Sequence, residues 1–284
     1  GRVVVVLYAS NADFPKLLDI PIVRYGTAYD EYPVGTGPYF YSQGLDYSFL
    51  SAFEDWRDSR ELPAARIYLQ SYEDSNIISA FENGYVDMVT LDRTSLNYYE
   101  YGGSYETKYY ETPIMQYVGF NAEGQVFSSL EMRQAVQYCI DRDRIVEDVM
   151  PENSAVAAEL PRHPNAEYYD EEIAGRYAFS FEKAEEIMNE MFFADFDRDG
   201  FREILTEAGE VREVSIDFIV NKENSSKLNA ARAIADRLVE YGFDVTLRAL
   251  SWSDYVYELE HQNFDMYYAE VQLTADFDVS CILD

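Results

Sequence analysis

Residues 213–270, EVSIDFIVNKENSSKLNAARAIADRLVEYGFDVTLRALSWSDYVYELEHQNFDMYYAE, decide the fold. Apolar residues alternate from Val214 to Val220, which predicts a strand. They then recur every three or four positions from Leu228 to Leu238, which predicts a helix that Gly242 closes. The first half of this stretch therefore reads as a strand followed by an amphipathic helix.

The second half repeats that order. Alternation at positions 243, 245 and 247 predicts a strand, Ser251 caps a helix, and residues 264–269 predict a third strand. Trp252 and Tyr255 lie at helical spacing, which favours core positions for both. A βαβαβ run implies parallel strands joined by right-handed crossovers, and such sheets bind ligands at the carboxyl ends of their strands. We therefore expect ligand groups in the loops after Val220, Leu247 and Ala269.

Upstream of this run, residues 130–138 and 143–149 predict two helices, the second capped by Asp141. The first of these helices places four residues on its buried side: Met132, Ala135, Val136 and Cys139. Residues 150–180 hold three prolines and little periodicity, so we expect a long surface loop before a helix at 181–192. A second lobe is expected to begin in this region.

The first 117 residues mix strands with few helices. Strands at 66–69 and 86–89 flank a helix at 75–83, which Asp74 or Ser75 can cap and Gly84 can end. Pro33-Val-Gly-Thr-Gly-Pro-Tyr39 predicts a shaped turn that leads into a strand at 39–41. It lacks the helix and lysine of a phosphate-binding loop, which argues against nucleotide. Residues 2–7 read as a further strand.

Composition narrows the class of protein. Apolar residues make up 48% of the chain, so it should fold despite a net charge of −31. With 53 acidic residues against 22 basic ones, nucleic acid and anionic lipid are excluded as partners. Two cysteines imply no disulfide framework; Cys139 reads as a buried thiol, and whether it pairs with Cys281 stays open. No bilayer-spanning stretch or leader pattern is visible.

One segment has the start of a calcium-binding loop. Asp195, Asp197 and Asp199 alternate before Gly200, and carboxylates at this spacing can surround a hard cation. The twelfth position is Thr206, where such loops carry glutamate, so a turn before a strand is the alternative. The only histidines, at 163 and 261, have no nucleophile or metal-ligand partner at a recognisable spacing, and we expect no enzymatic activity.

Six segments in order resemble the extracellular solute-binding protein family 5, which includes the oligopeptide-, dipeptide- and nickel-binding proteins of ABC importers. They are Pro33-Val-Gly-Thr-Gly-Pro-Tyr39, Ala80-Phe-Glu-Asn-Gly-Tyr-Val-Asp87, Tyr117-Val-Gly-Phe-Asn121, Met132-Arg-Gln-Ala-Val-Gln-Tyr-Cys-Ile-Asp-Arg142, Ile234-Ala-Asp-Arg-Leu-Val-Glu-Tyr-Gly242 and Asn263-Phe-Asp265. The resemblance implies an α/β, periplasmic-binding-protein-like clamp of type II, with mixed sheets and flanking helices. This chain resembles a central fragment of one.

The resemblance also implies an organisation and a site. Residues 1–117 would form part of lobe I and residues 118–284 most of the second large lobe, with the βαβαβ run at 213–270 inside it and Gly119 near a crossover. Asp276 and Asp278 stand where relatives carry an acidic residue that meets a peptide's ammonium group, with Phe277 between them and Glu270 in the same loop. The alternative is a pair of solvated loop carboxylates.

The implied function is capture of an extracellular solute, above all short peptides, for delivery to an ABC permease in the membrane. A nickel-chelate or oligosaccharide binder is the alternative within the family, and a calcium-stabilised surface scaffold is the alternative outside it. The full-length protein would act as a monomer at the cell surface or in the periplasm, with a lipid anchor. The isolated fragment would bind solute weakly or not at all.

Overall fold

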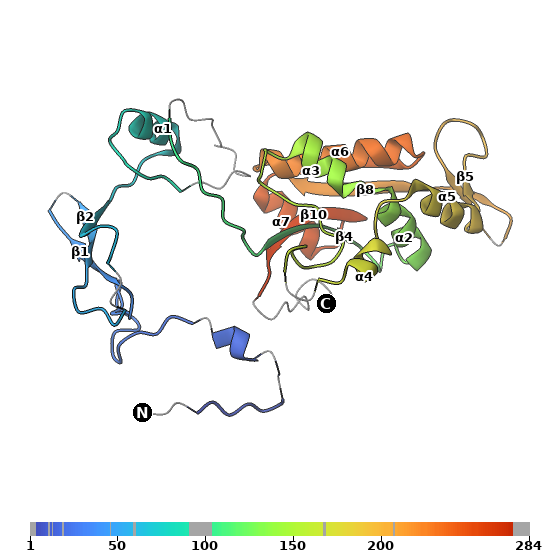
Figure 1. Ribbon diagram of the computed structural model, residues 1–284. Helices are drawn as coiled ribbons and strands as arrows, with labels where there is room; N and C mark the ends of the chain where they lie inside the picture. Colours follow the sequence, from blue (N-terminus) through green and yellow to red (C-terminus); the bar gives the residue numbers. More distant parts are fainter. Residues whose placement is uncertain are drawn as a thin grey trace. The chain divides into compact units, whose positions relative to one another are not determined.

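The computed structural model describes residues 4–10, 12, 14–18, 20–45, 47–58, 61–90, 104–166, 169–206 and 208–274 (Figure 1). The described residues divide into two compact units: unit 1 runs up to Thr90 and includes residues 104 and 105, and unit 2 runs from Glu106 onward. Within the described ranges, no helix combines the length and the apolar character needed to cross a membrane.

Unit 1 contains a three-stranded antiparallel sheet. Its strands are β1 (Tyr39–Gln43), β2 (Ser48–Ala52) and β3 (Arg66–Leu69), paired in the order β1-β2-β3. A 3-10 turn, η1 (Phe14–Leu18), precedes the sheet, and helix α1 (Asp74–Glu82) follows it. Gly84 has a φ of 72° just after α1, so the left-handed helix end predicted there is confirmed.

Three local predictions in unit 1 are wrong. Residues 86–89 form no strand, and neither do residues 4–7, where Val4 and Val6 are 66% and 85% exposed. A strand needs a neighbour to hydrogen bond with, and neither segment pairs with any strand among the described residues. The N-cap of α1 is Glu73, whose side chain makes no capping hydrogen bond.

Unit 2 is built on a four-stranded mixed sheet. Its strands are β4 (Ile114–Phe120), β8 (Ser215–Asn221), β9 (Asp244–Leu250) and β10 (Met266–Gln272), in the order β4-β10-β8-β9. β8 pairs in parallel with β9 and with β10, while β4 is antiparallel to β10. The three parallel strands predicted from the βαβαβ pattern are therefore confirmed. β4, which spans the expected lobe boundary at 117, lies wholly in unit 2.

Helices cover both faces of this sheet (Figure 1). On one face, α6 (Ser225–Glu240), α2 (Leu130–Cys139), α3 (Arg142–Val149) and α5 (Phe181–Glu190) bury the main core, whose largest members include Phe127, Phe193, Phe218 and Phe243. Ile219 and Tyr255 are buried outside that cluster, where α7 (Trp252–Glu260) packs on β8 and β9. The four predicted buried positions of α2 are confirmed.

The remaining elements frame this core. Asp141 caps α3 as predicted, accepting from the Arg144 N–H at 3.1 Å. The expected long loop at 150–180 contains a short helix, α4 (Glu171–Gly175). Strands β5 (Phe193–Ala194), β6 (Glu203–Leu205) and β7 (Val211–Glu213) form a small antiparallel sheet after α5. They place the acidic segment 195–200 in the turn between β5 and β6.

Gly119 lies inside β4, directly opposite Tyr267 of β10. A Cβ atom added at Gly119 would overlap the Tyr267 ring. The structure thus gives this glycine a packing reason that the sequence did not suggest, because the aromatic ring lies over the bare Cα.

Candidate functional site

The carboxyl edge of the parallel strands contains a topological switch point. From β8 the chain passes through α6 to β9 on one side, and from β9 through α7 to β10 on the other side of β8. The connections therefore diverge between the carboxyl ends of β8 and β10. Open α/β sheets bind ligands at such a point, because the loops on its two sides separate there.

An ion pair occupies the switch point. Lys227, in the first turn of α6, places its Nζ 2.6 Å from Oε1 of Glu270 on β10. The Lys227 side chain is 16% exposed and that of Glu270 is 40% exposed. Asn224 fixes the start of α6 by accepting from the Lys227 N–H at 3.0 Å. The helix cap therefore positions the lysine that meets Glu270.

A buried tyrosine on the same strand holds Gln116, the residue opposite Glu270. The Tyr268 hydroxyl donates to Oε1 of Gln116 at 2.7 Å, and the Tyr255 hydroxyl donates to the Tyr268 carbonyl at 2.8 Å. Burial, and secondly the negative charge of Glu270, raise the pKa of Tyr268 above its ordinary value. Tyr268 therefore stays a neutral donor, and it fixes Gln116 next to Glu270, its partner in the β4–β10 register.

The end of β9 adds an exposed aromatic ring. Ser251 caps α7, accepting from the Asp254 N–H and donating to its Oδ2 at 2.6 Å. Oε1 of Glu223, from the loop after β8, accepts from the Trp252 N–H at 3.0 Å. Trp252 is 59% exposed, so its predicted core position is wrong, whereas Tyr255 is buried as predicted. Trp252 therefore gives the described part of this edge a large exposed aromatic side chain.

Of the four predicted ligand-binding residues, only Glu270 lies in the described part of the chain. Glu270 lies within β10 and not in the loop after it, because pairing with β4 extends the strand to Gln272, and its carboxylate pairs with Lys227. Asp276, Phe277, Asp278 and Cys281 lie outside the described residues. Sequence reasoning missed Lys227, Glu223 and Trp252. Lys227 had a usable signal, because a basic residue in the first turn after a predicted strand lies at the carboxyl edge by construction.

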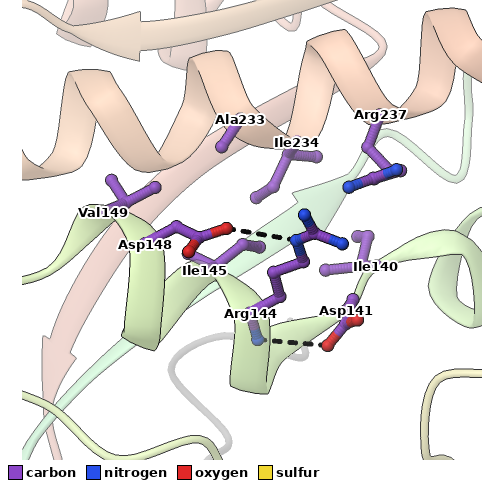
Figure 2. A pocket seen from close by; sticks show the side chains of 9 residues that line it. All are labelled: Ile140, Asp141, Arg144, Ile145, Asp148, Val149, Ala233, Ile234 and Arg237. Atoms are coloured by element: carbon purple, nitrogen blue, oxygen red, sulfur yellow. Dashed lines mark hydrogen bonds and ion pairs between the residues drawn. The ribbon is translucent and has the colours of Figure 1, made fainter.

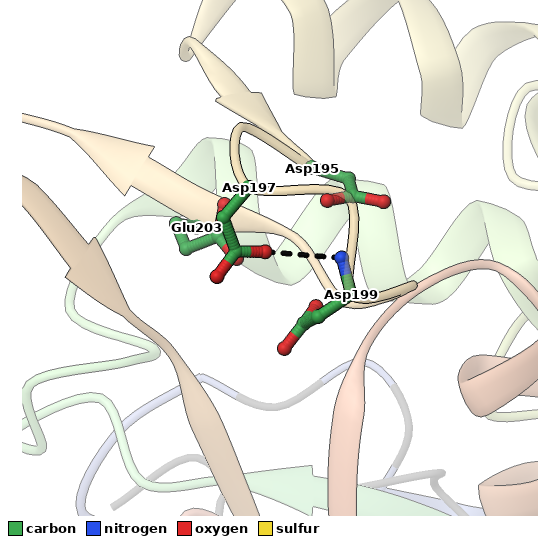
Figure 3. Close-up of side chains that lie close together, drawn as sticks. All are labelled: Asp195, Asp197, Asp199 and Glu203. Carbon is green, nitrogen blue, oxygen red and sulfur yellow. Dashed lines mark hydrogen bonds between the residues drawn. The ribbon is translucent and has the colours of Figure 1, made fainter.

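The acidic turn between β5 and β6 forms a separate cluster (Figure 3). Carboxylate oxygens of Asp195, Asp197, Asp199 and Glu203 all lie within 4.8 Å of one another, and only Glu203, which the sequence analysis missed, is buried. Asp195 accepts from the N–H groups of residues 198 and 200, and Glu203 accepts from that of Phe196 at 2.8 Å. These bonds account for the shape of the turn, while four crowded carboxylates are also ligands that calcium prefers.

A small hollow lies between α3 and α6 (Figure 2). Its charged side chains are already engaged: Nε of Arg144 is 3.1 Å from Oδ2 of Asp148, and Arg237 pairs with Glu240 at 2.6 Å. The part of α6 that lines the hollow, Ala233 to Arg237, is well separated along the helix from Lys227. The hollow is therefore not part of the carboxyl edge.

The profile described as bacterial extracellular solute-binding proteins, family 5 Middle, matches residues 2–278. Oligopeptide-binding protein AppA of Bacillus subtilis (strain 168) is 22% identical over 236 residues, covering 82% of this chain and 42% of AppA.

Solved structures agree on the fold. A periplasmic oligopeptide-binding protein of Thermotoga maritima superposes with a TM-score of 0.63 at 24% identity, covering 87% of this chain and 49% of that one. Its structure with bound mannohexaose gives 0.53 at 25% identity, over 86% and 47% of the two chains. NikA from Brucella suis in complex with Fe(III)-EDTA gives 0.59 at 16% identity, over 84% and 48%.

The chain spans less than half the length of each of these relatives. The profile match nevertheless extends over almost all of its residues, and the mixed sheet with flanking helices is the one that these structures share. The predictions of family and fold class are confirmed. The chain belongs to the bacterial extracellular solute-binding proteins, family 5.

Proposed function

We propose that this chain forms part of a receptor that captures short peptides outside the cytoplasm and delivers them to an ABC permease. The observation that carries the proposal is the family match over residues 2–278, together with a switch-point edge that offers an exposed aromatic ring beside polar groups. A peptide needs both, because its side chains are often apolar while its backbone and termini are polar. The name of the Bacillus subtilis relative agrees with a peptide ligand.

The site residues have distinct proposed roles. Trp252 packs against a side chain of the peptide, since its ring is exposed and its backbone is held by Glu223. Asp276 or Asp278 accepts the ammonium group of the peptide, because a carboxylate after the last parallel strand can make that charge-assisted bond. Phe277 between them supplies an apolar contact.

The receptor works as a monomeric two-lobed clamp outside the cytoplasm, and its full-length form is lipid-anchored. Unit 1 contributes to one lobe and unit 2 to the other. In this proposal the protein binds its solute and catalyses no reaction. A net charge of −31 gives nucleic acid no part in it.

The thermal midpoint of the full-length protein tests the proposal. It would be measured with short peptides, nickel–histidine, Fe(III)-EDTA, mannohexaose and calcium, each added separately. A ligand at about 100 times its Kd adds about 2.7 kcal/mol to the free energy of unfolding, which is a readable shift. Peptides should raise the midpoint. If only a metal chelate or only mannohexaose raises the midpoint, that compound and not a peptide is the ligand class. If only calcium raises it, the protein is a calcium-stabilised surface scaffold with its ion at the 195–203 turn.

Variants identify the site in the same assay. Asp276→Asn or Asp278→Asn should reduce the peptide-induced shift, and so should Trp252→Ala. Tyr257→Ala is the matched control for Trp252, because Tyr257 is a similarly exposed aromatic residue on α7 that stacks on His261. Equal effects of Trp252→Ala and Tyr257→Ala would remove Trp252 from the site.

A further inference from the structure

The carboxylates at the described part of the switch-point edge are already engaged. Glu270 pairs with Lys227 at 2.6 Å, Glu223 accepts from the Trp252 N–H, and Asp254 accepts from the Ser251 hydroxyl. A solute group that reaches the ends of β8 and β10 therefore meets a pair of opposite charges, Lys227 and Glu270. This is unexpected in a chain with 53 acidic residues.

The two members of the pair depend on each other unequally. The Lys227 side chain is largely removed from water, and an ammonium group in such a place is costly unless a partner compensates its charge. Glu270 is more exposed, so a solute can approach its carboxylate from outside. Each residue is therefore the counter-ion of the other, and removing one leaves a single charge at the site where a solute group is expected.

We propose that the Lys227–Glu270 ion pair sets the charge selectivity of this edge, favouring solutes whose group at this position is uncharged. A charged group of either sign gains little from the neutral pair, and it loses its own hydration when it binds. The inference rests on the proposed function, and it narrows the ligand to peptides with an uncharged side chain at this position.

The test uses the full-length protein and a panel of tripeptides. Each position in turn is Gln, Glu or Lys and the other two are Ala, so that charge changes while size stays similar. Affinities are measured by isothermal titration calorimetry. At one of the three peptide positions, the one that meets the ion pair, the unchanged protein should bind the Gln peptide more tightly than the Glu or Lys peptide.

Single variants should move selectivity in opposite directions. Lys227→Met leaves the Glu270 carboxylate alone and should favour the Lys-containing peptide by about tenfold, the effect of one charge-assisted hydrogen bond. Glu270→Gln leaves the Lys227 ammonium alone and should favour the Glu-containing peptide by about tenfold. The double variant Lys227→Met, Glu270→Gln removes both charges and should restore the preference for Gln.

The possible results separate the two proposals. If the single variants weaken all peptides of the panel equally, the pair is only structural and the inference is overturned. A charge-swapped variant, Lys227→Glu with Glu270→Lys, serves if a single variant fails to fold; it should keep the preference for Gln, and its loss would also overturn the inference. If the unchanged protein binds no peptide of the panel, the proposed function fails, and the inference with it.

Discussion

Replacing Arg248 with methionine should destabilise unit 2, because this one side chain joins three segments at the amino end of the parallel strands. Its guanidinium donates to both oxygens of Asp217 on β8, at 2.8 and 2.7 Å, and to the carbonyl of Asn263 at 2.6 Å. Glu258 of α7 lies 3.4 Å away. Arg248→Met removes these bonds and leaves two carboxylates without their shared cation.

The magnitude follows from the number of bonds and their exposure. A hydrogen bond to a charged group contributes about 1.5–3 kcal/mol when well shielded. The side chains of Arg248 and Asp217 are 31% and 36% exposed, so solvent screening lowers the contribution of each bond. We expect Arg248→Met to lower the free energy of unfolding by about 2 kcal/mol.

Urea unfolding followed by circular dichroism measures this loss. Arg232→Met is the matched control, because Arg232 lies on the exposed side of α6 and its only described hydrogen bond is a long one to Asn229, at 3.5 Å. Asp217→Asn in the Arg248→Met background should cost much less than in the unchanged protein, since the two residues act as one unit. A loss as small as that of Arg232→Met, or full additivity with Asp217→Asn, would refute the reasoning.

The remaining predictions each concern one partly or fully buried position. Burial raises the pKa of Asp265, so the stability that this residue contributes is present at low pH and is lost as pH rises through its folded-state pKa. The free energy of unfolding of Asp265→Asn, measured in urea, should therefore rise relative to that of the unchanged protein over this pH range. A difference between the two proteins that stays constant with pH would contradict the prediction. Gly119→Ala should lower the thermal midpoint by the equivalent of about 1–3 kcal/mol because the new methyl group overlaps Tyr267, and Gly175→Ala, which has open space, should not. Burial raises the pKa of the Cys139 thiol to about 12, so iodoacetamide at pH 8 should modify this residue, located by peptide mass spectrometry, only after unfolding.

Periodicity predicted unit 2 well. The alternation from Val214 to Val220 and the stripe from Leu228 to Leu238 correspond to β8 and α6, because one side of each element faces a large core. Two helix N-caps were also predicted correctly: the side chains of Asp141 and Ser251 both accept a hydrogen bond from the backbone N–H three residues further along the chain. Local sequence patterns were enough to predict these elements, because the conformation that each segment prefers by itself is also the one that the core requires.

Prediction failed where tertiary context decides. The valines at 4–6 have strand propensity but no pairing partner in the described structure, and Trp252 has helical spacing but lies at the exposed start of α7. The Lys227–Glu270 pair joins residues 43 positions apart, so no local pattern could reveal it. Glu270 was predicted in the loop after a strand ending at Ala269, which was wrong because β10 continues to Gln272. Its partner depended on the order of strands in the sheet.

Hydrogen–deuterium exchange of the full-length protein, with and without a saturating peptide, tests the central claim most directly. The account predicts that the peptide slows exchange at the carboxyl ends of the parallel strands and in the residues that follow them in the sequence, at 221–227, 250–254 and 270–278. Exchange at the amino ends of the strands, near Asp217 and Asp265, should be unchanged. Protection confined to those amino ends, or to the acidic turn at 195–203, would contradict a solute site at the switch point.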